Sequence, residues 1–360
     1  MTADVVFGGV DVIAVTRRNV LKGAAGGALS LGMPFGSASA ASGQITVADP
    51  GGAFGEGYRK AFYDPFEKAT GIKVINVARE AEPTAQIKAI VETKSYTWDA
   101  SILTMAARDI LAAQNLLDPI NVSPADTAGY MPEAQTPYWL GTDTYATLFA
   151  YRTDVFKDGP KSWTDFWDVK RFPGRRSLSK SPIDTLEQAL LADGVPADKL
   201  YPLDLDRAFK SLDRIKPHVA VWWAGGAQSA QIIQSGEVDM VAIWNGRAQA
   251  VVDGGAPVKL VWNQGIYSIE GWAIPKGGPR VELVRQFIKF CANPERQAAY
   301  TDILSYGPPN LDAYKYVSKE RAAVLPSSPE NLKLVVRQDE KWWGANRAAA
   351  LERFNTWLLS

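Results

Sequence analysis

YWLGTDTYATLFAYRTDV, residues 138–155, and KLVWNQGIYSIEGWAIPK, residues 259–276, are two long strand-like segments that set the architecture of this chain. Both are rich in aromatic and β-branched residues, which favour strands. The sequence around them alternates shorter strand-like and helix-like stretches, a pattern typical of α/β domains. We therefore expect an α/β fold with two lobes, in which these segments cross between the lobes and leave a hinged cleft. Small ligands bind in clefts of that kind.

The elements on either side of the crossings are predicted from hydrophobic spacing, glycines and prolines. In the first lobe we expect a mostly parallel sheet, with a glycine-rich turn at 49–57. The elements predicted there are strands at 44–48, 72–77 and 98–103 and helices at 58–70, 85–94, 107–117, 282–292 and 294–304. In the second lobe we expect helices at 185–192, 204–215 and 228–235, strands at 219–223 and 238–244, and a largely helical segment from about 318 onward.

The predicted lobes exchange segments at the two crossings. The first lobe is expected to comprise 43–148 and 272–315, and the second 149–271 and 316–360. Residues 1–40 are expected to be an export signal, because Arg17-Arg18 precedes a short Gly/Ala-rich run and Ala38-Ser39-Ala40 supplies a cleavage site. The run falls short of the ~20 residues that span a bilayer. The arginine pair indicates the twin-arginine route, with cleavage near Ala40-Ala41 and a free periplasmic protein.

The amino-acid composition limits the kinds of partner that we expect the protein to bind. The chain has 39 basic and 39 acidic residues, which argues against a nucleic acid or an anionic membrane as its main ligand. Cys291 is the single cysteine and lies in an apolar helical stretch, so we expect a buried structural thiol and no disulfide. His218 is the single histidine and is expected to be structural. We predict no metal site, no cofactor and a monomer.

Enzyme motifs are missing from the sequence. There is no GxSxG or HExxH pattern, and one histidine alone would have to serve as the base of any triad. An exported hydrolase is therefore a weak alternative, although a carboxylate-pair glycosidase stays open by motif alone. The sequence favours a binding protein over an enzyme.

Trp244-Asn245-Gly246-Arg247, followed by Glu270, is the most informative set of side chains. It combines an aromatic platform, a permanent cation and a carboxylate within one stretch rich in turns. A zwitterion with separated charges needs that set, because Arg binds a carboxylate bidentately while aromatic rings and an acid hold an ammonium group. The turn Ala224-Gly225-Gly226-Ala227 before the next helix adds N–H donors for the same carboxylate.

The whole chain after the export signal resembles the periplasmic solute-binding proteins of ABC importers. The resemblance rests on TGIKV, SWTDFWDVKRFPGR, SGEVDMVAIWNG, EGWAIPKGGP and YGPPN, in that order. It is strongest for the spermidine/putrescine-type receptors. The family implies a two-lobed type II periplasmic binding-protein fold that closes on a small amine or amino-acid ligand and docks to an inner-membrane ABC permease.

The family's pocket implies several ligand contacts. Trp244 resembles the Trp that stacks on the ligand, and Glu270 stands where an acid holds one ammonium. Phe54 approximates an aromatic wall, Thr104 a hydroxyl residue after a strand, and Asp184 a second acid. Trp222 and Trp223 point to opposite faces of a strand, and we favour Trp223 for the cleft.

Departures from the polyamine pattern change the expected ligand. Arg247 replaces a small residue, Ser268 replaces an aromatic, and an acid is missing near Ser181. A guanidinium would repel one end of a diamine but attract a carboxylate. Arg247 with Glu270 therefore resembles the branch that binds 4-aminobutyrate-like ω-amino acids.

Other interpretations stay open. Arg247 and Glu270 could form an internal salt bridge, and Trp244 could be core packing. A polyamine receptor would use Glu270 and Asp184 for two ammonium groups. A ferric-ion receptor would need clustered tyrosines, and Tyr267 and Tyr306 are not adjacent in the sequence.

Overall fold

The computed structural model describes residues 43–79 and 82–360, so the predicted export signal lies outside the described residues. Within them the chain forms a mixed α/β fold around one eleven-stranded sheet, whose main path runs β2-β1-β3-β10-β6-β9-β7-β8. The strands are β1 (Gln44–Asp49), β2 (Lys73–Ala78), β3 (Ala100–Thr104), β4 (Leu117–Asp118), β5 (Gln135–Thr136), β6 (Trp139–Arg152), β7 (Arg176–Ser179), β8 (Val219–Trp223), β9 (Met240–Trp244), β10 (Val258–Pro275) and β11 (Val336–Arg337).

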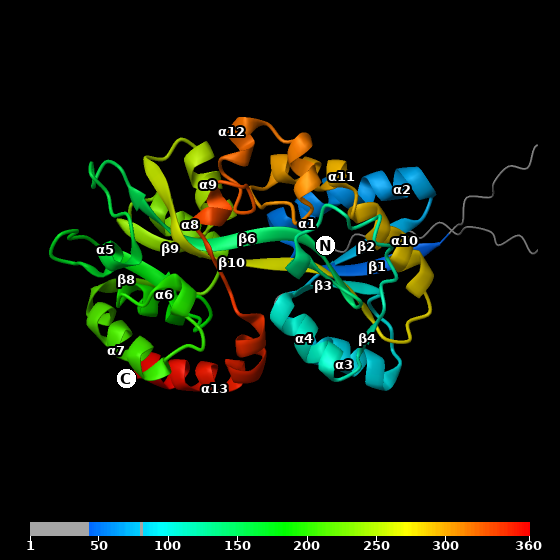
Figure 1. The fold of residues 1–360 in the computed structure, drawn as a ribbon, viewed down its shortest axis with the longest axis horizontal. Helices are drawn as coiled ribbons and strands as arrows, with labels where there is room; N and C mark the ends of the chain where they lie inside the picture. The colour runs from blue at the N-terminus through cyan, green and yellow to red at the C-terminus, as the bar shows by residue number, and fades with distance from the viewer. Residues whose placement is uncertain (1–42, 80–81) are drawn as a thin grey trace, which may run out of the picture. The chain divides into compact units, whose positions relative to one another are not determined.

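Helices flank this sheet along its length (Figure 1). They are α1 (Gly52–Tyr58), α2 (Asp64–Thr70), α3 (Thr84–Thr93), α4 (Met105–Ala113), α5 (Trp163–Trp167), α6 (Thr185–Ala192), α7 (Leu205–Ile215), α8 (Gly226–Gln234), α9 (Asn245–Asp253), α10 (Val281–Cys291), α11 (Pro294–Ile303), α12 (Lys319–Ala322) and α13 (Glu340–Leu359). Six of them agree with a predicted helix to within about two residues, namely α3, α6, α7, α8, α10 and α11, whereas α5 and α9 were not predicted.

Strands β6 and β10 are the predicted crossings. They have 14 and 18 residues, pair with each other antiparallel, and run side by side through the middle of the sheet (Figure 1). β10 also pairs antiparallel with β3 on one side, and β6 with β9 on the other. Along its main path the sheet is therefore parallel only in its flanks, where β1 lies between β2 and β3 and β7 between β8 and β9, while the short β11 pairs in parallel with β10 off this path. An outgoing and a returning strand must run in opposite directions, which explains the antiparallel centre.

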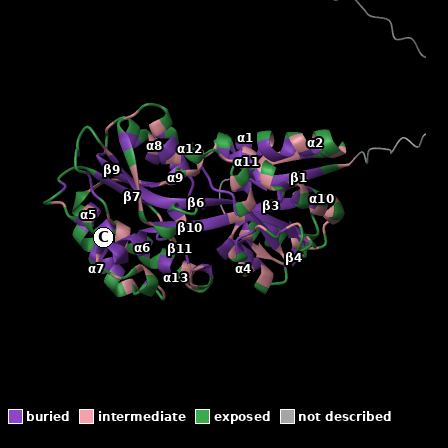
Figure 2. Ribbon diagram, turned by 45° about the horizontal axis from the view of Figure 1, so that its top comes forward, coloured by how far each residue is buried: buried purple, intermediate pink, exposed green. Residues whose placement is uncertain are grey.

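The buried core is divided along the crossings, and Figure 2 shows buried residues along the sheet on both sides of them. One hydrophobic cluster includes Ala146 of β6 and Tyr267 of β10. The next residues outward, Leu148 and Ile266, belong to two other clusters. Each crossing strand thus passes from one hydrophobic cluster to another at the position where Thr147 of β6 pairs with Ile266 of β10. The lobe boundaries remain a prediction. On β6, Thr147 lies next to the predicted boundary after residue 148. On β10, Ile266 lies five residues before the predicted boundary after residue 271.

The glycine-rich segment at 49–57 is a helix start rather than the predicted turn. Gly51 and Gly52, at φ 69° and 56°, make the sharp turn, and the Gly51 N–H donates to Asp49 Oδ1 at 2.7 Å. α1 begins at Gly52 and continues through a π-helical segment, Arg59–Tyr63, into α2. A Cβ on Gly57 would lie 2.9 Å from the ring of Tyr300, so this glycine allows close helix packing.

Two helix predictions were too long. α4 ends at Ala113, because Asn115 adopts a φ of 57° and the following residues enter β4. The segment from 318 is helical only in α12 and α13, with irregular chain and the short β11 between them. Cys291 is buried, as predicted.

Helix α13 is fixed to the fold by Trp343 in its first turn. Trp343 is fully buried, and its indole N–H donates to Glu187 Oε1 at 2.5 Å. The Tyr201 hydroxyl donates to the same oxygen at 2.6 Å. Burial, reinforced by Asp184, raises the pKa of Glu187 to about 8.

We predict that Glu187→Gln stabilises the protein at high pH. Since the folded-state pKa of about 8 lies above the ordinary 4.5, stability from the protonated form is full below about 4.5 and is lost as pH rises toward 8. The amide stays neutral, so the variant should exceed the wild type by a few kcal/mol in urea unfolding at pH 8.5 and match it near pH 5. Glu352→Gln, exposed on α13, is the control. A difference independent of pH would contradict the assignment.

Candidate functional site

Glu270 stands between two polar neighbours on the sheet. On β10 it pairs with Thr104 at the end of β3 and with Asp143 of β6. Residues directly opposite each other in antiparallel strands project from the same face with close Cβ atoms. The register therefore brings the predicted residues Thr104 and Glu270 together, and it adds Asp143, which the sequence interpretation missed.

The same face of β6 continues toward the second group of predicted residues. Asp143, Tyr145 and Thr147 alternate with inward-packing residues and share one face. Thr147 pairs with Trp244, the last residue of β9, and its hydroxyl donates to Asp184 at 2.6 Å. Trp244 and Asp184 thus both meet the site at Thr147.

Asp184 begins α6 in a constrained conformation. Its φ is 66°, and it makes no side-chain cap of the helix. Its carboxylate instead accepts from Thr147 and from the Gln338 side chain at 2.8 Å. Burial raises the pKa of Asp184 to about 6, against these two hydrogen bonds, which lower it.

The Trp244–Arg247 motif builds a corner of the site. Asn245 is fully buried, accepts the N–H of Ala146 at 2.9 Å and donates to the Ser305 carbonyl at 2.5 Å. A Cβ on Gly246 would lie 2.6 Å from the Tyr306 ring. Asn245 and Gly246 therefore hold Tyr306 against the start of α9. Trp244 and Arg247 are the residues directly before and after them in the chain.

The side chain of Arg247, which belongs to α9, lies at the N-terminus of α8. A Cβ on Gly226, the first residue of α8, would be 2.7 Å from two ring atoms of Trp244 and 3.2 Å from Arg247 Nε. α8 has no side-chain cap, and the buried Nε has no hydrogen-bond partner among the described residues. Within those residues no ion pair joins Arg247 to Glu270, so the internal salt bridge is not formed in this structure.

Arg247 and the carboxyl groups of Asp143 and Glu270 act on Tyr306 in opposite directions. Burial raises the pKa of Tyr306, the Arg247 guanidinium lowers it, and Asp143 and Glu270 raise it again. Burial also raises the pKa of Glu270 to about 7; Arg79 opposes this shift. The site can therefore present a cation to one end of a ligand and carboxyl groups to the other.

The two remaining predicted residues are aromatic. Phe54 on α1 is buried, stacks on Tyr58 at a centroid distance of 4.6 Å, and lies 6.2 Å from Tyr306. Trp223 is 2% exposed, donates its indole N–H to Ala242, and meets Trp244 edge-on at 5.4 Å. Trp223 thus packs against the ring of Trp244.

Tyr145 resolves one departure from the polyamine pattern. It pairs directly with Ser268, so the neighbouring strand supplies an aromatic ring beside the position where the sequence has a serine. Burial raises the pKa of Tyr145, and Asp184 and Glu270 both raise it further. The alternation of polar residues in GTDTYAT was the signal that could have identified Asp143 and Tyr145.

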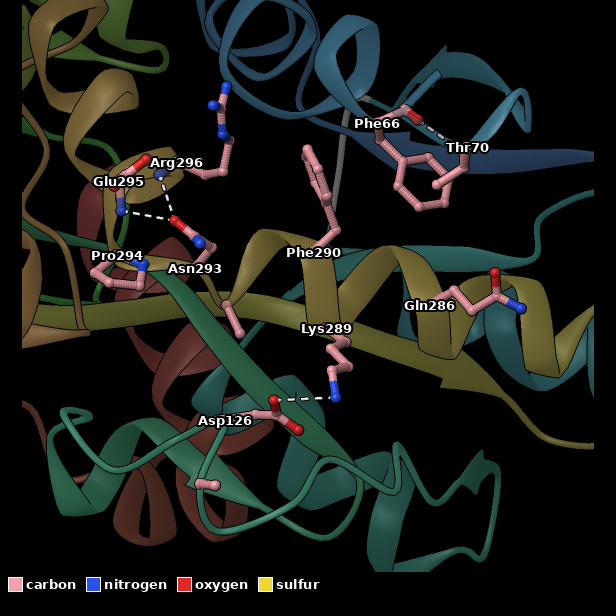
Figure 3. Close-up of a pocket in the computed structure, with 12 residues that line it drawn as sticks. Phe66, Thr70, Asp126, Gln286, Lys289, Phe290, Asn293, Pro294, Glu295 and Arg296 are labelled. Carbon is pink, nitrogen blue, oxygen red and sulfur yellow. Dashed lines mark hydrogen bonds and ion pairs between the residues drawn. The ribbon is translucent and has the colours of Figure 1, made fainter. Parts of the chain in front are cut away.

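A groove of about 620 Å³ lies elsewhere, on α10 and α11, and shares no residue with this site. Figure 3 shows its lining, in which Lys289 pairs with Asp126 at 3.1 Å and Asn293 caps α11. In the described part of the chain, no group of three or more His, Cys, Asp or Glu side chains could hold a metal ion. Residues 43–79 and 82–360 also contain no helix that is long and apolar enough to cross a membrane.

Comparison with known proteins agrees with this geometry. The gamma-aminobutyric acid-binding protein of Pseudomonas aeruginosa PAO1 is 33% identical over 337 residues, which cover 91% of this chain and 94% of that protein. The spermidine/putrescine-binding periplasmic protein of Escherichia coli K12 is 26% identical over 270 residues, 72% of this chain and 76% of that protein.

Solved structures show the same fold. An ABC transporter substrate-binding protein from Bradyrhizobium japonicum USDA 110 superposes with a TM-score of 0.83 at 38% identity, over 88% of this chain and 99% of that one. The Atu4243 GABA receptor gives 0.81 at 32% identity, over 88% and 97%. The two-lobed binding-protein fold expected from the sequence is thereby confirmed. Residues 61–326 match the model for bacterial extracellular solute-binding proteins, and the chain belongs to that family.

Proposed function

We propose that this protein is the substrate-binding component of an ABC importer and that it captures an ω-amino acid such as 4-aminobutyrate. The observation that carries the proposal is the arrangement of charge around Tyr306. Arg247, whose buried Nε is unpartnered, and the carboxyl groups of Glu270 and Asp143 act on Tyr306 in opposite directions. A ligand with a carboxylate and an ammonium at opposite ends would pair with both kinds of group.

Arg247 would hold the carboxylate. A guanidinium offers two parallel N–H donors to a carboxylate, and the uncapped N-terminus of α8 beside it adds backbone N–H groups and a positive helix end. A buried charge is tolerated when it is paired, so the ligand carboxylate would satisfy the group that the protein leaves open.

Glu270 and the aromatic side chains would hold the amine end. Trp244 and Tyr306 provide ring faces between the charged ends, and Phe54 continues this wall from α1. Methylene groups pack on such rings, and an ammonium is attracted by them as well as by the carboxyl groups. Two relatives named for 4-aminobutyrate binding, at 33% and 32% identity, support this ligand class.

Capture would occur by lobe closure. Phe54 and Thr104 lie with the first core cluster, whereas Trp244 and Arg247 lie on β9 and α9 beside the others. A ligand that contacts both groups stabilises the closed form only through those simultaneous contacts. We propose no enzymatic activity, and we propose export to the periplasm by the twin-arginine route, action as a monomer and docking to an ABC permease.

A polyamine receptor is the second candidate. Asp143, Asp184 and Glu270 all face the same strand surface, and relatives named for spermidine/putrescine binding are 26% identical. Asp184 is already bonded to Thr147 and Gln338, however, and Arg247 would repel a second ammonium group. The geometry therefore favours the amino acid.

We predict that Arg247→Ala weakens 4-aminobutyrate binding at least 100-fold, because a carboxylate would be buried without its cation. Putrescine should bind this variant no more weakly than it binds the wild type. Isothermal titration with 4-aminobutyrate, β-alanine, 5-aminovalerate, putrescine and spermidine measures both effects, and Arg353→Ala, an exposed arginine paired with Asp206, is the control. Equal loss of amino acids and diamines would contradict the carboxylate role of Arg247.

A matched glycine pair tests the α8 corner. Gly226→Ala places a Cβ 2.7 Å from the Trp244 ring and should displace both Trp244 and Arg247, lowering 4-aminobutyrate affinity at least tenfold. Gly225→Ala, one residue earlier, meets nothing within 4 Å and should bind within about twofold of the wild type. Titration of both variants, with thermal unfolding to confirm folding, decides the point. Equal affinities in the two variants would place the ligand away from this corner.

A further inference from the structure

Asp143 is a buried carboxyl group that the predicted pocket does not include. It is fully buried on β6, directly opposite Glu270. The Tyr58 hydroxyl donates to its Oδ2 at 2.5 Å, and its Oδ1 has no hydrogen-bond partner among the described residues. A buried carboxyl oxygen without a partner is costly, so this atom requires an explanation.

A second unpartnered polar atom lies beside it. Tyr300 on α11 is 1% exposed, and its hydroxyl has no hydrogen-bond partner in the described part of the chain. Its ring meets Tyr58 edge-on at 4.7 Å, and Asp143 and Glu270 both act on the hydroxyl electrostatically. Two buried polar atoms therefore remain open next to Glu270, on the ammonium side of Tyr306.

The charges around this pair make a second negative charge unfavourable. Burial and Glu270 raise the pKa of Asp143 well above its ordinary value. Glu82 and Asp49 act on Glu270 in the same direction, and Arg79 acts against them. Tyr58 and Tyr300 are the titratable groups that face Asp143 from α1 and α11. Burial and the neighbouring carboxyl group thus favour a proton on the empty pair, whereas an arriving cation would favour the fully ionised pair.

We propose that Asp143 and Glu270 together bind the ligand's ammonium group, and that the subsite selects a primary ammonium over a methylated one. The inference rests on the proposed function only in taking the ligand to carry an ammonium group. A primary ammonium has three N–H donors, and Glu270, Asp143 Oδ1 and Tyr300 Oη offer three acceptors. A trimethylammonium group donates no hydrogen bond and would leave the last two unpaired.

Binding would release a proton from the pair to solvent. The protonated Asp143 and the incoming R–NH₃⁺ become an Asp143 carboxylate bonded to R–NH₃⁺, and the displaced H⁺ passes to the buffer. Affinity should therefore rise with pH across the range in which the pair still holds its proton. A residue that only supports the fold would not produce this proton release.

The test compares wild type, Asp143→Asn and Tyr300→Phe by isothermal titration at pH 7 in two buffers of different ionisation enthalpy. The ligands are 4-aminobutyrate, putrescine and 4-(trimethylammonio)butyrate. We expect Asp143→Asn to bind 4-aminobutyrate at least tenfold more weakly and to release fewer protons. Wild type should bind the trimethyl compound at least tenfold more weakly than 4-aminobutyrate. Tyr300→Phe should lose several-fold for the primary amines only.

Two controls keep the result interpretable. Asp213→Asn makes the same chemical change at an exposed carboxyl, which accepts from Trp357, and should bind like the wild type. Thermal unfolding shows whether each variant folds. If Asp143→Asn does not fold, Tyr300→Phe and the trimethyl ligand carry the test. The inference is wrong if folded Asp143→Asn binds within twofold of the wild type, or if the trimethyl compound binds as tightly as 4-aminobutyrate.

Failure of the proposed function would look different. A wild type that binds putrescine but not 4-aminobutyrate would overturn the amino-acid assignment, and putrescine would then report on Asp143. A wild type that binds 4-aminobutyrate with no loss in Asp143→Asn or Tyr300→Phe would overturn only the ammonium subsite.

Discussion

The antiparallel pairing of β6 with β10 is the constraint on which the rest of the structure depends. It joins the two groups of core residues, and its register places Asp143 opposite Glu270 and Tyr145 opposite Ser268. A slip of one residue would turn each of these side chains to the other face of the sheet. The flanking strands β3 and β9 then add Thr104 and Trp244 to the same surface. Strand register, more than loop conformation, thus places the residues of the candidate site.

The site keeps buried polar atoms that the protein itself does not satisfy. Arg247 Nε and Asp143 Oδ1 have no partners within the described residues, although both are buried. Such groups destabilise an isolated protein, and a binding protein can retain them because a ligand of complementary charge removes the cost. These unsatisfied atoms lower the stability of the protein without ligand, at the positions that we propose bind it.

Much of this arrangement was accessible from the sequence. The crossings and most of the helices that were predicted follow from local pattern, and the proposed joint role of Trp244, Arg247 and Glu270 follows from pattern together with the family resemblance. Asp143 and Tyr145 were missed because their importance depends on which residue of β10 each one faces, and register is not visible in either strand alone. The glycines at 51–57 were misread because a turn and a tightly packed helix both require small residues.

Tyr306 has a distinctive mechanical position. The segment around it is attached to β6 directly by two backbone hydrogen bonds between Thr144 and Gly307, of 2.7 and 2.8 Å. It is attached indirectly through Asn245 of α9, which accepts from the Ala146 N–H of β6 and donates to the Ser305 carbonyl. Phe54, in contrast, approaches Tyr306 from α1 through ring contact alone. Phe54 and Tyr306 nevertheless share the first core cluster, whereas Asn245 lies at the start of α9 in the predicted second lobe. Separation of the predicted lobes would therefore leave Tyr306 with Phe54, and the hydrogen bond from Asn245 to the Ser305 carbonyl would act as a tether between the lobes.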